Sequence, residues 1–281
     1  MLRAARAALL TMVPAELLLR LLPVSGVPLP GPLVAVANVA ALALLAVQAV
    51  VGYRQFRDQR RGGAGRGTAL RAVYGQFVPE PVRRIMGFDL KGMVSLVLWA
   101  TRRRHGVPSD ATAVSYSGAQ SSTMVVFLVL AVAELVAVEA VLRAIGAPAG
   151  LRTVLLLVDG YGILIMLSII AACITRPHVV SADEVRIRYG AFFDLRVPRE
   201  QIAEVRRIRN YNESGAVKVN DERLAVAVSA QTNVLLELTG PVTVVRPLGR
   251  RCQVRTIRFF ADDPAAAINA LHLHREYSPK L

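Results

Sequence analysis

The stretch LVAVANVAALALLAVQAVV, residues 33–51, determines the fold class of this chain. It is 19 residues long, and only Asn38 and Gln48 interrupt its leucines, valines and alanines. A helix rises by about 1.5 Å per residue, so about 20 apolar residues are enough to cross the hydrocarbon core of a bilayer. The stretch therefore predicts a transmembrane helix.

Two more apolar runs follow, over residues 122–142 and 153–175. Glu134 and Glu139 interrupt the former, and Asp159 interrupts the latter. Both runs are longer than an ordinary core helix, and we expect them to form a second membrane hairpin. The composition agrees with this, because 54% of the 281 residues are hydrophobic and the mean hydropathy is +0.44. These values exclude a disordered chain.

A fourth apolar stretch, residues 7–24, is less regular because it contains Pro14, Glu16 and Arg20. Glu16 and Arg20 are four positions apart, so they can pair on one face of a helix. Two internal charges and the lack of a small-residue cleavage site argue against a signal peptide. We expect a transmembrane helix here, with a helix lying in the membrane interface as the alternative.

The charge distribution predicts the orientation of these helices. The segment 53–121 carries twelve basic and four acidic residues, a net charge of +8, whereas segments 1–52 and 122–175 carry +2 and −1. The connections 25–32 and 144–151 between the apolar runs have no charge. The positive-inside rule therefore places the 53–121 segment in the cytoplasm. Four crossings of the cell membrane then place both termini in the cytoplasm as well.

Within this basic segment, residues 82–101 show apolar side chains at helical spacing, and the only tryptophan, Trp99, lies near their C-terminal end. Arg102, Arg103 and Arg104 follow directly. Tryptophan and arginine are typical of the headgroup level of a bilayer. We expect a helix lying in the membrane interface. The alternative is a helix packed on the C-terminal domain.

From residue 178 the long apolar runs are replaced by short segments in which apolar and polar residues alternate. Apolar and charged residues alternate over 184–189 and again over 193–197, which predicts a hairpin with one buried face. Further strands are expected over 203–209, 224–228, 234–238, 242–245 and 255–259. Asp262, Asp263 and Pro264 then predict the start of a helix, with an aspartate cap and proline at the first helical position.

Some seven strands followed by one helix resemble a pleckstrin-homology-like (PH-like) β-barrel, in the bacterial form that is attached to membrane helices. The resemblance rests on VSADEVRIRYG, residues 180–190, and on VPREQIAEV, residues 197–205. The whole chain also resembles multi-pass membrane proteins of high-GC actinobacteria. The resemblance implies a scaffolding or assembly role at the membrane, with lipid binding as an option, and it transfers no catalytic residue.

The expected fold is thus an α-helical membrane bundle of about four transmembrane helices plus a cytoplasmic β-rich PH-like barrel with a closing helix. The expected parts are an N-terminal hairpin (1–52), a basic cytoplasmic loop (53–121), a second hairpin (122–175) and the β-domain (176–281).

Acidic residues inside the membrane runs are the first candidates for function. Glu134 and Asp159 lie at similar depths in two runs joined by a short loop, and intramembrane acids are often functional. Two adjacent carboxyl groups could share a proton. The alternative is pairing within the bundle, which we expect for Glu139 and Arg143 because they are four positions apart.

Arginines of the β-domain are the second group of candidates. They form either solvated faces or a surface for anionic lipid or an acidic partner. The residues are Arg206, Arg207, Arg209, Arg250, Arg251, Arg255 and Arg258.

Motifs for catalysis, metals and cofactors are absent from the sequence. No P-loop, dinucleotide glycine fingerprint, G-x-S-x-G or H-E-x-x-H occurs. His272 and His274 lack the spacing of a zinc site, and Cys173 and Cys252 should be reduced and unpaired. We expect no catalytic residue, metal or cofactor. Much of the excess basic charge lies beside the membrane runs, so anionic lipid is a nearer phosphate source than nucleic acid, and no nucleic-acid partner is expected.

The expected function is therefore that of a non-enzymatic membrane scaffold or regulator, which binds a protein partner or anionic lipid through its cytoplasmic domain. The alternative is a transporter or proton-coupled subunit that uses Glu134 and Asp159. A membrane enzyme is the third option, for which the sequence offers no nucleophile and base.

Overall fold

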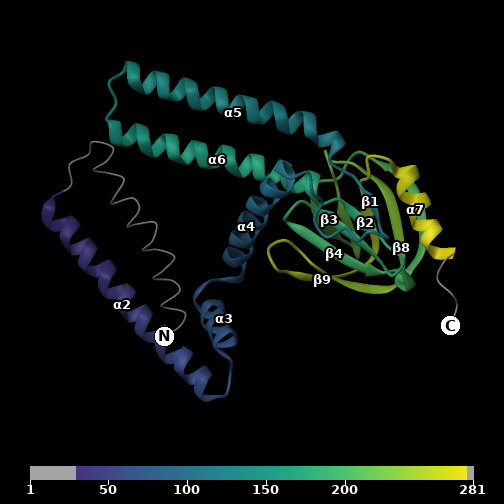
Figure 1. The fold of residues 1–281 in the computed structure, drawn as a ribbon, viewed down its shortest axis with the longest axis horizontal. Helices are drawn as coiled ribbons and strands as arrows, with labels where there is room; N and C mark the ends of the chain where they lie inside the picture. Colours follow the sequence, from purple (N-terminus) through teal and green to yellow (C-terminus); the bar gives the residue numbers. More distant parts are fainter. Residues whose placement is uncertain (1–29, 277–281) are drawn as a thin grey trace. The chain divides into compact units, whose positions relative to one another are not determined.

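The computed structural model describes residues 30–276, and Figure 1 shows their helices and strands. The helix expected over residues 7–24 lies outside the described residues. The chain divides into two compact units. Of the described residues, one unit comprises 30–83 and 134–160, and the other comprises 84–133 and 161–276.

In the first unit, α2 (Gly31–Arg61) contains the run that determined the fold class. The helix continues beyond that run to Arg61, where Gly63 adopts a left-handed backbone with φ 85°. The N–H of Ala64 then donates to the carbonyl of Gln59 at 3.1 Å, which completes a glycine-type helix end. A second helix, α3 (Arg66–Phe77), follows within the segment that was expected as a basic cytoplasmic loop.

Among the described residues, three helices are long and apolar enough to cross a membrane. They are Val34–Arg61 within α2, α5 (Gly118–Ala144) and α6 (Ala149–Thr175), with mean hydropathies of 2.3, 2.6 and 2.4. The expected apolar helices are therefore present at all three places. No residue of α5 is buried, as suits a helix whose surface faces lipid.

Helix α4 (Glu80–Ala100) occupies the stretch that was expected as an interfacial helix. One of its faces packs inside the second unit. The ring of Phe88 meets that of Phe192 at 5.3 Å, and Gly92 lies against Ser168 of α6. Other positions expose large apolar side chains to the surroundings, namely those of Met86, Leu90, Val94 and Val97. The helix thus packs on its own domain and still presents an unburied apolar face.

The β-rich region contains nine strands within residues 30–276, and Figure 1 shows α7 beside them. The strands are β1 (Thr112–Val114), β2 (His178–Val180), β3 (Glu184–Tyr189), β4 (Phe193–Pro198), β5 (Ile202–Asn210), β6 (Val217–Asn220), β7 (Arg223–Val226), β8 (Thr232–Val245) and β9 (Arg251–Phe259).

These strands form two sheets and not the closed barrel that was expected. A four-stranded sheet has the order β1-β2-β3-β4, and a five-stranded sheet has the order β5-β8-β9-β7-β6. The chain passes from one sheet to the other through the 3₁₀ turn η1 (Arg199–Gln201), and β4 and β5 do not pair. The two segments expected over 234–238 and 242–245 belong to one long strand, β8, with an irregularity between Glu237 and Val242.

One hydrophobic core joins both sheets. Ile187 of the first sheet and Leu236 and Ile257 of the second are fully buried in it. Helix α7 (Pro264–Glu276) covers this core with Ala267 and Leu271. The C-terminal part is therefore a β-rich domain closed by a helix.

The helix start predicted for α7 is present. The backbone N–H of Ala266 donates to Oδ1 of Asp263 at 2.9 Å, and Pro264 is the first helical residue. Asp263 is thus the N-cap of α7.

Strand β1 connects the α5–α6 hairpin to this domain. It immediately precedes α5, while its partner β2 immediately follows α6. The two strands pair antiparallel, with Thr112 opposite Val180 and Val114 opposite His178. Both ends of the α5–α6 hairpin therefore continue into neighbouring strands of one sheet.

Candidate functional site at the junction of helices and sheet

The region where α4, α5 and α6 meet the four-stranded sheet, here called the junction, lies within the second unit. Its centre is His178, the first residue of β2, whose ring is buried. The backbone N–H of Arg188 donates to Nδ1 of His178 at 3.0 Å. Since a backbone N–H can only donate, the ring proton lies on Nε2, which donates to the carbonyl of Phe260 at 3.0 Å. Burial lowers the pKa of His178 to about 4, so the ring is neutral at physiological pH.

Tyr116 packs on this histidine, with 4.6 Å between the ring centroids. Its hydroxyl oxygen accepts the N–H of Gly190 at 2.6 Å. Burial raises the pKa of Tyr116 well above its usual value. The hydroxyl and the imidazole are both enclosed, so this pair supports the fold and does not face a ligand.

Arg188 is the largest of the fully buried side chains, with 1% of its surface exposed. Its guanidinium group donates to the carbonyl of His105 at 2.8 Å and to that of Gly106 at 3.0 Å. Gly106 has φ 58°, and a Cβ there would lie 3.1 Å from the Arg188 guanidinium. Arg188 therefore fixes the loop that follows α4, and a glycine is needed for this approach.

Positive charge exceeds negative charge in the junction. Arg186 makes a bidentate ion pair with Asp194. Its Nε donates to Oδ1 at 2.6 Å and its Nη2 donates to Oδ2 at 2.5 Å. Arg176 instead donates to the hydroxyl of Ser95 at 3.1 Å. Burial, followed by the charges of Arg176, Arg188 and Arg186, lowers the pKa of His105. The junction therefore has a positive local potential that favours an anion.

A groove of about 630 Å³ opens beside this positive region. Its walls come from the end of α4, the link between β1 and α5, and the last residues of α6. The polar and aromatic lining residues are Trp99, Arg102, Arg103, Arg104, Ser115, Ser117 and Thr175. In the part of the chain that the structure describes, the side chains of the three arginines have no hydrogen bond or ion pair. The groove thus combines free guanidinium groups with hydroxyl groups.

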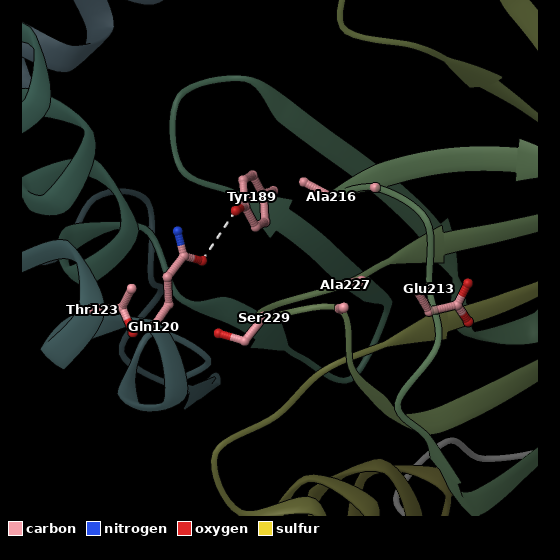
Figure 2. Close-up of a pocket in the computed structure, with 9 residues that line it drawn as sticks. Gln120, Thr123, Tyr189, Glu213, Ala216, Ala227 and Ser229 are labelled. Atoms are coloured by element: carbon pink, nitrogen blue, oxygen red, sulfur yellow. Dashed lines mark hydrogen bonds between the residues drawn. The ribbon is translucent and has the colours of Figure 1, made fainter. Parts of the chain in front are cut away.

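A second hollow, of about 290 Å³, lies beside the start of α5 (Figure 2). The hydroxyl of Tyr189 donates to Oε1 of Gln120 at 3.1 Å across one side of it. Glu213, on another side, already accepts hydrogen bonds from Asn210 at 2.7 Å and from Thr232 at 3.2 Å. Its charged group is therefore engaged, which makes this hollow a weaker candidate than the arginine groove.

The structure does not connect the predicted membrane acids Glu134 and Asp159. Glu134 is exposed on α5, and neither carboxylate has a hydrogen bond or ion pair with any residue from 30 to 276. Glu139 accepts from Arg143 at 2.7 Å, as its spacing suggested, and also from Arg152. Sequence spacing could not identify Arg152, because it lies beyond the turn between α5 and α6.

The predicted arginines of the β-domain are spread over β5, β9 and the turn between β8 and β9. Three of them pair with acids: Arg206 with Glu204 at 2.5 Å, Arg255 with Glu222 at 3.2 Å and Arg258 with Glu213 at 4.0 Å. The other four have no ion pair among the described residues, namely Arg207, Arg209, Arg250 and Arg251. In the sequence, Arg102, Arg103 and Arg104 stand out only as the basic end of a helix, and no local signal there indicates the groove that they line.

Within the described residues, no group of three or more histidine, cysteine and acidic side chains could bind a metal ion. Cys173 and Cys252 are free thiols. Comparison with protein-family models, curated proteins and solved structures finds no match to the chain. The geometry of the junction is therefore the basis for a functional proposal.

Proposed function

We propose that this chain is a non-enzymatic integral membrane scaffold or regulatory protein. Its β-rich domain has a PH-like layout and binds a protein partner or anionic lipid at the cytoplasmic surface. The membrane part crosses the bilayer four times, with both termini in the cytoplasm. The supporting observation is the pairing of β1 with β2 at the two ends of the α5–α6 hairpin.

This pairing constrains the membrane topology. Opposed residues of antiparallel strands lie about 5 Å apart, so the two ends of the hairpin must lie on the same side of the bilayer. The links are short, with three residues between β1 and α5 and two between α6 and β2. Such short links keep the domain next to the end of the hairpin, which suits a protein that presents a binding surface at the membrane.

The second support for this proposal comes from α4. One face of this helix packs on the domain, and its exposed face includes Leu90, Val94 and Val97. An exposed apolar face on an otherwise packed helix is typical of a helix lying in the membrane interface. The domain thus has a third contact with the bilayer besides α5 and α6.

A transporter or proton-coupled subunit remains the second candidate function. Its specific support is that Glu134 and Asp159 have no partner among the described residues, although charged groups inside a bilayer are costly unless paired.

Complementation of a deletion strain separates the two functions. The double variant Glu134→Gln and Asp159→Asn should complement like the natural chain, while Ala113→Pro should fail because proline disrupts the short strand β1. The conservative Ala113→Ser is the matched control, and immunoblots of the membrane fraction report whether each variant is present. Loss of complementation by the double variant, at normal melting temperature and abundance, would instead establish the transporter.

A further inference from the structure

We infer that the groove formed by Trp99, Arg102, Arg103, Arg104, Ser115 and Ser117 binds the phosphate group of an anionic phospholipid. This inference rests on the proposed function, which places the cytoplasmic end of α6 at the level of the lipid headgroups. It assigns lipid binding to the junction and not to the predicted arginines of the β-sheets.

The groove lies at the C-terminal end of α6. Ile174 and Thr175, the last residues of the apolar helix α6, form part of its lining. The 27 residues of α6 span about 40 Å, roughly the thickness of a bilayer with its headgroup regions, so this end of the helix lies at headgroup level. Trp99, in the wall formed by the end of α4, has 42% of its surface exposed, and tryptophan side chains favour the headgroup region. The groove therefore opens at the level where phospholipid phosphates lie.

The chemistry of the lining is the second argument. Guanidinium groups bind phosphate oxygens through paired hydrogen bonds, and serine hydroxyls can add single donors. In residues 30–276 the side chains of Arg102, Arg103 and Arg104 have no acidic partner, unlike Arg186 with Asp194 in the same junction. The volume of about 630 Å³ is within the range of small-molecule sites. The groove can therefore accept a phosphate together with its glycerol.

The backbone of Arg102 is the third argument. Arg102 has φ 55°, in the left-handed region that glycine usually occupies at a helix end. Its N–H donates to the carbonyl of Trp99 at 3.0 Å, and that of Arg103 donates to the carbonyl of Leu98 at 2.8 Å. The N–H of His105 donates to the carbonyl of Thr175 at 2.8 Å, which attaches the loop to α6. A charged residue thus occupies a strained position in a fixed loop, as is common where a side chain has a ligand.

The same residue gives a discriminating variant. Arg102→Gly removes the guanidinium group and also relieves the left-handed strain, so the melting temperature should stay the same or rise. A loss of lipid binding in this variant therefore cannot come from unfolding. Arg103→Gln is a second variant that keeps the side-chain length, and Arg246→Gln, in the turn after β8, is the control for the loss of one positive charge.

The experiment uses the full chain in mild detergent and its single tryptophan as the reporter. Phosphatidylglycerol with brominated acyl chains should quench Trp99 at lower concentration than brominated phosphatidylcholine does. A basic residue near an anionic surface contributes about 1 kcal/mol, which is roughly a fivefold change in binding. Arg102→Gly and Arg103→Gln should each reduce the preference for phosphatidylglycerol about fivefold, while Arg246→Gln should leave it unchanged.

Equal quenching by the two lipids, or an unchanged preference in both groove variants, would overturn the inference. Glycerol 3-phosphate serves as a competitor against brominated phosphatidylglycerol. If glycerol 3-phosphate displaces brominated phosphatidylglycerol at equal concentration, the ligand is a soluble phosphate ester. This result would overturn the lipid assignment. These results are independent of the complementation by Ala113→Pro and by the double carboxylate variant, so failure of the groove and failure of the scaffold are distinguishable.

Discussion

The carboxylate of Asp262 accepts the backbone N–H of Gly118 at 2.9 and 3.1 Å, although 144 residues separate the two in the chain. Gly118 is the first residue of α5, and Asp262 lies between β9 and α7. A Cβ at position 118 would lie 2.9 Å from Oδ1 of Asp262, so glycine permits this approach. The negative charge also favours the N-terminus of a helix. A residue near the end of the β-domain therefore caps a candidate membrane helix.

Removing this cap should destabilise the start of α5. Asp262→Ala should lower the free energy of unfolding by about 1 kcal/mol, as is typical for the loss of an N-cap. Hydrogen exchange in detergent should rise in the first turn of α5, residues 118–121. Asp263→Ala is the matched control, because it should increase exchange at the start of α7 instead. Equal exchange of residues 118–121 in both variants would contradict the role assigned to Asp262.

Two glycines of α4 should respond oppositely to the same substitution. At Gly92 a Cβ would lie 2.7 Å from Oγ of Ser168, so Gly92→Ala should lower the melting temperature by pushing α4 away from α6, at a cost of about 1–3 kcal/mol. At Gly87 a Cβ would meet no atom within 4 Å, so Gly87→Ala should stabilise the helix by about 0.5–1 kcal/mol. Circular dichroism of the detergent-solubilised chain measures both. Stabilisation by Gly92→Ala would show that α4 does not pack there.

The buried histidine predicts a pH dependence of stability. Because the pKa of His178 falls from 6.5 to about 4 on folding, the unfolded chain binds more protons between these values. Stability should therefore be complete above pH 6.5 and decrease as the pH falls towards 4, by about 3 kcal/mol in total. His105 should contribute in the same direction, because its pKa is also lowered. The pKa of Asp194 is lowered from its usual value, so this carboxylate affects the pH dependence of stability only below the range in which His178 acts.

Unfolding of the detergent-solubilised chain at pH 7.5, 6 and 5 provides the measurement. His178→Gln should be less stable at pH 7.5 and should show a smaller loss on acidification, while His105→Gln should retain most of the dependence. A natural chain that is equally stable at pH 7.5 and pH 5 would contradict the buried neutral imidazole.

Cysteine labelling in intact cells tests the proposed topology. In a chain whose natural cysteines have been replaced, Ser25→Cys should react with an impermeant reagent, because the loop at 25–32 is uncharged and expected outside. Arg60→Cys and Ala230→Cys should stay unreactive until the membrane is permeabilised. Labelling at position 60 but not at position 25 would mean that the orientation is inverted.

The long apolar helices and the start of α7 could be predicted because their signals are local. Length and hydropathy identify α2, α5 and α6, and the aspartate–proline pair at 263–264 identifies the start of α7. The hairpin β3–β4 was predictable for the same reason, since alternation alone specifies a strand with one buried face.

The features that the sequence did not predict depend on residues far away in the chain. Strand β1 has only three residues, too few to show alternation, and it becomes a strand because β2 pairs with it. Asp262 and Asp263 are chemically identical neighbours, yet they cap different helices. Likewise, Arg102, Arg103 and Arg104 appear in the sequence as one basic run. Only the folded loop places them in a groove with Ser115 and Ser117.

The pairing of β1 with β2 also determines the order of events during synthesis. Strand β1 leaves the ribosome first, and its partner appears only after both α5 and α6 have been made. The four-stranded sheet therefore cannot be completed before both helices have been synthesised. If only one of the two helices crossed the bilayer, β1 and β2 would end up in different compartments and β2 would keep an unpaired edge. In the proposed topology, insertion of both helices is thus a precondition for a complete four-stranded sheet.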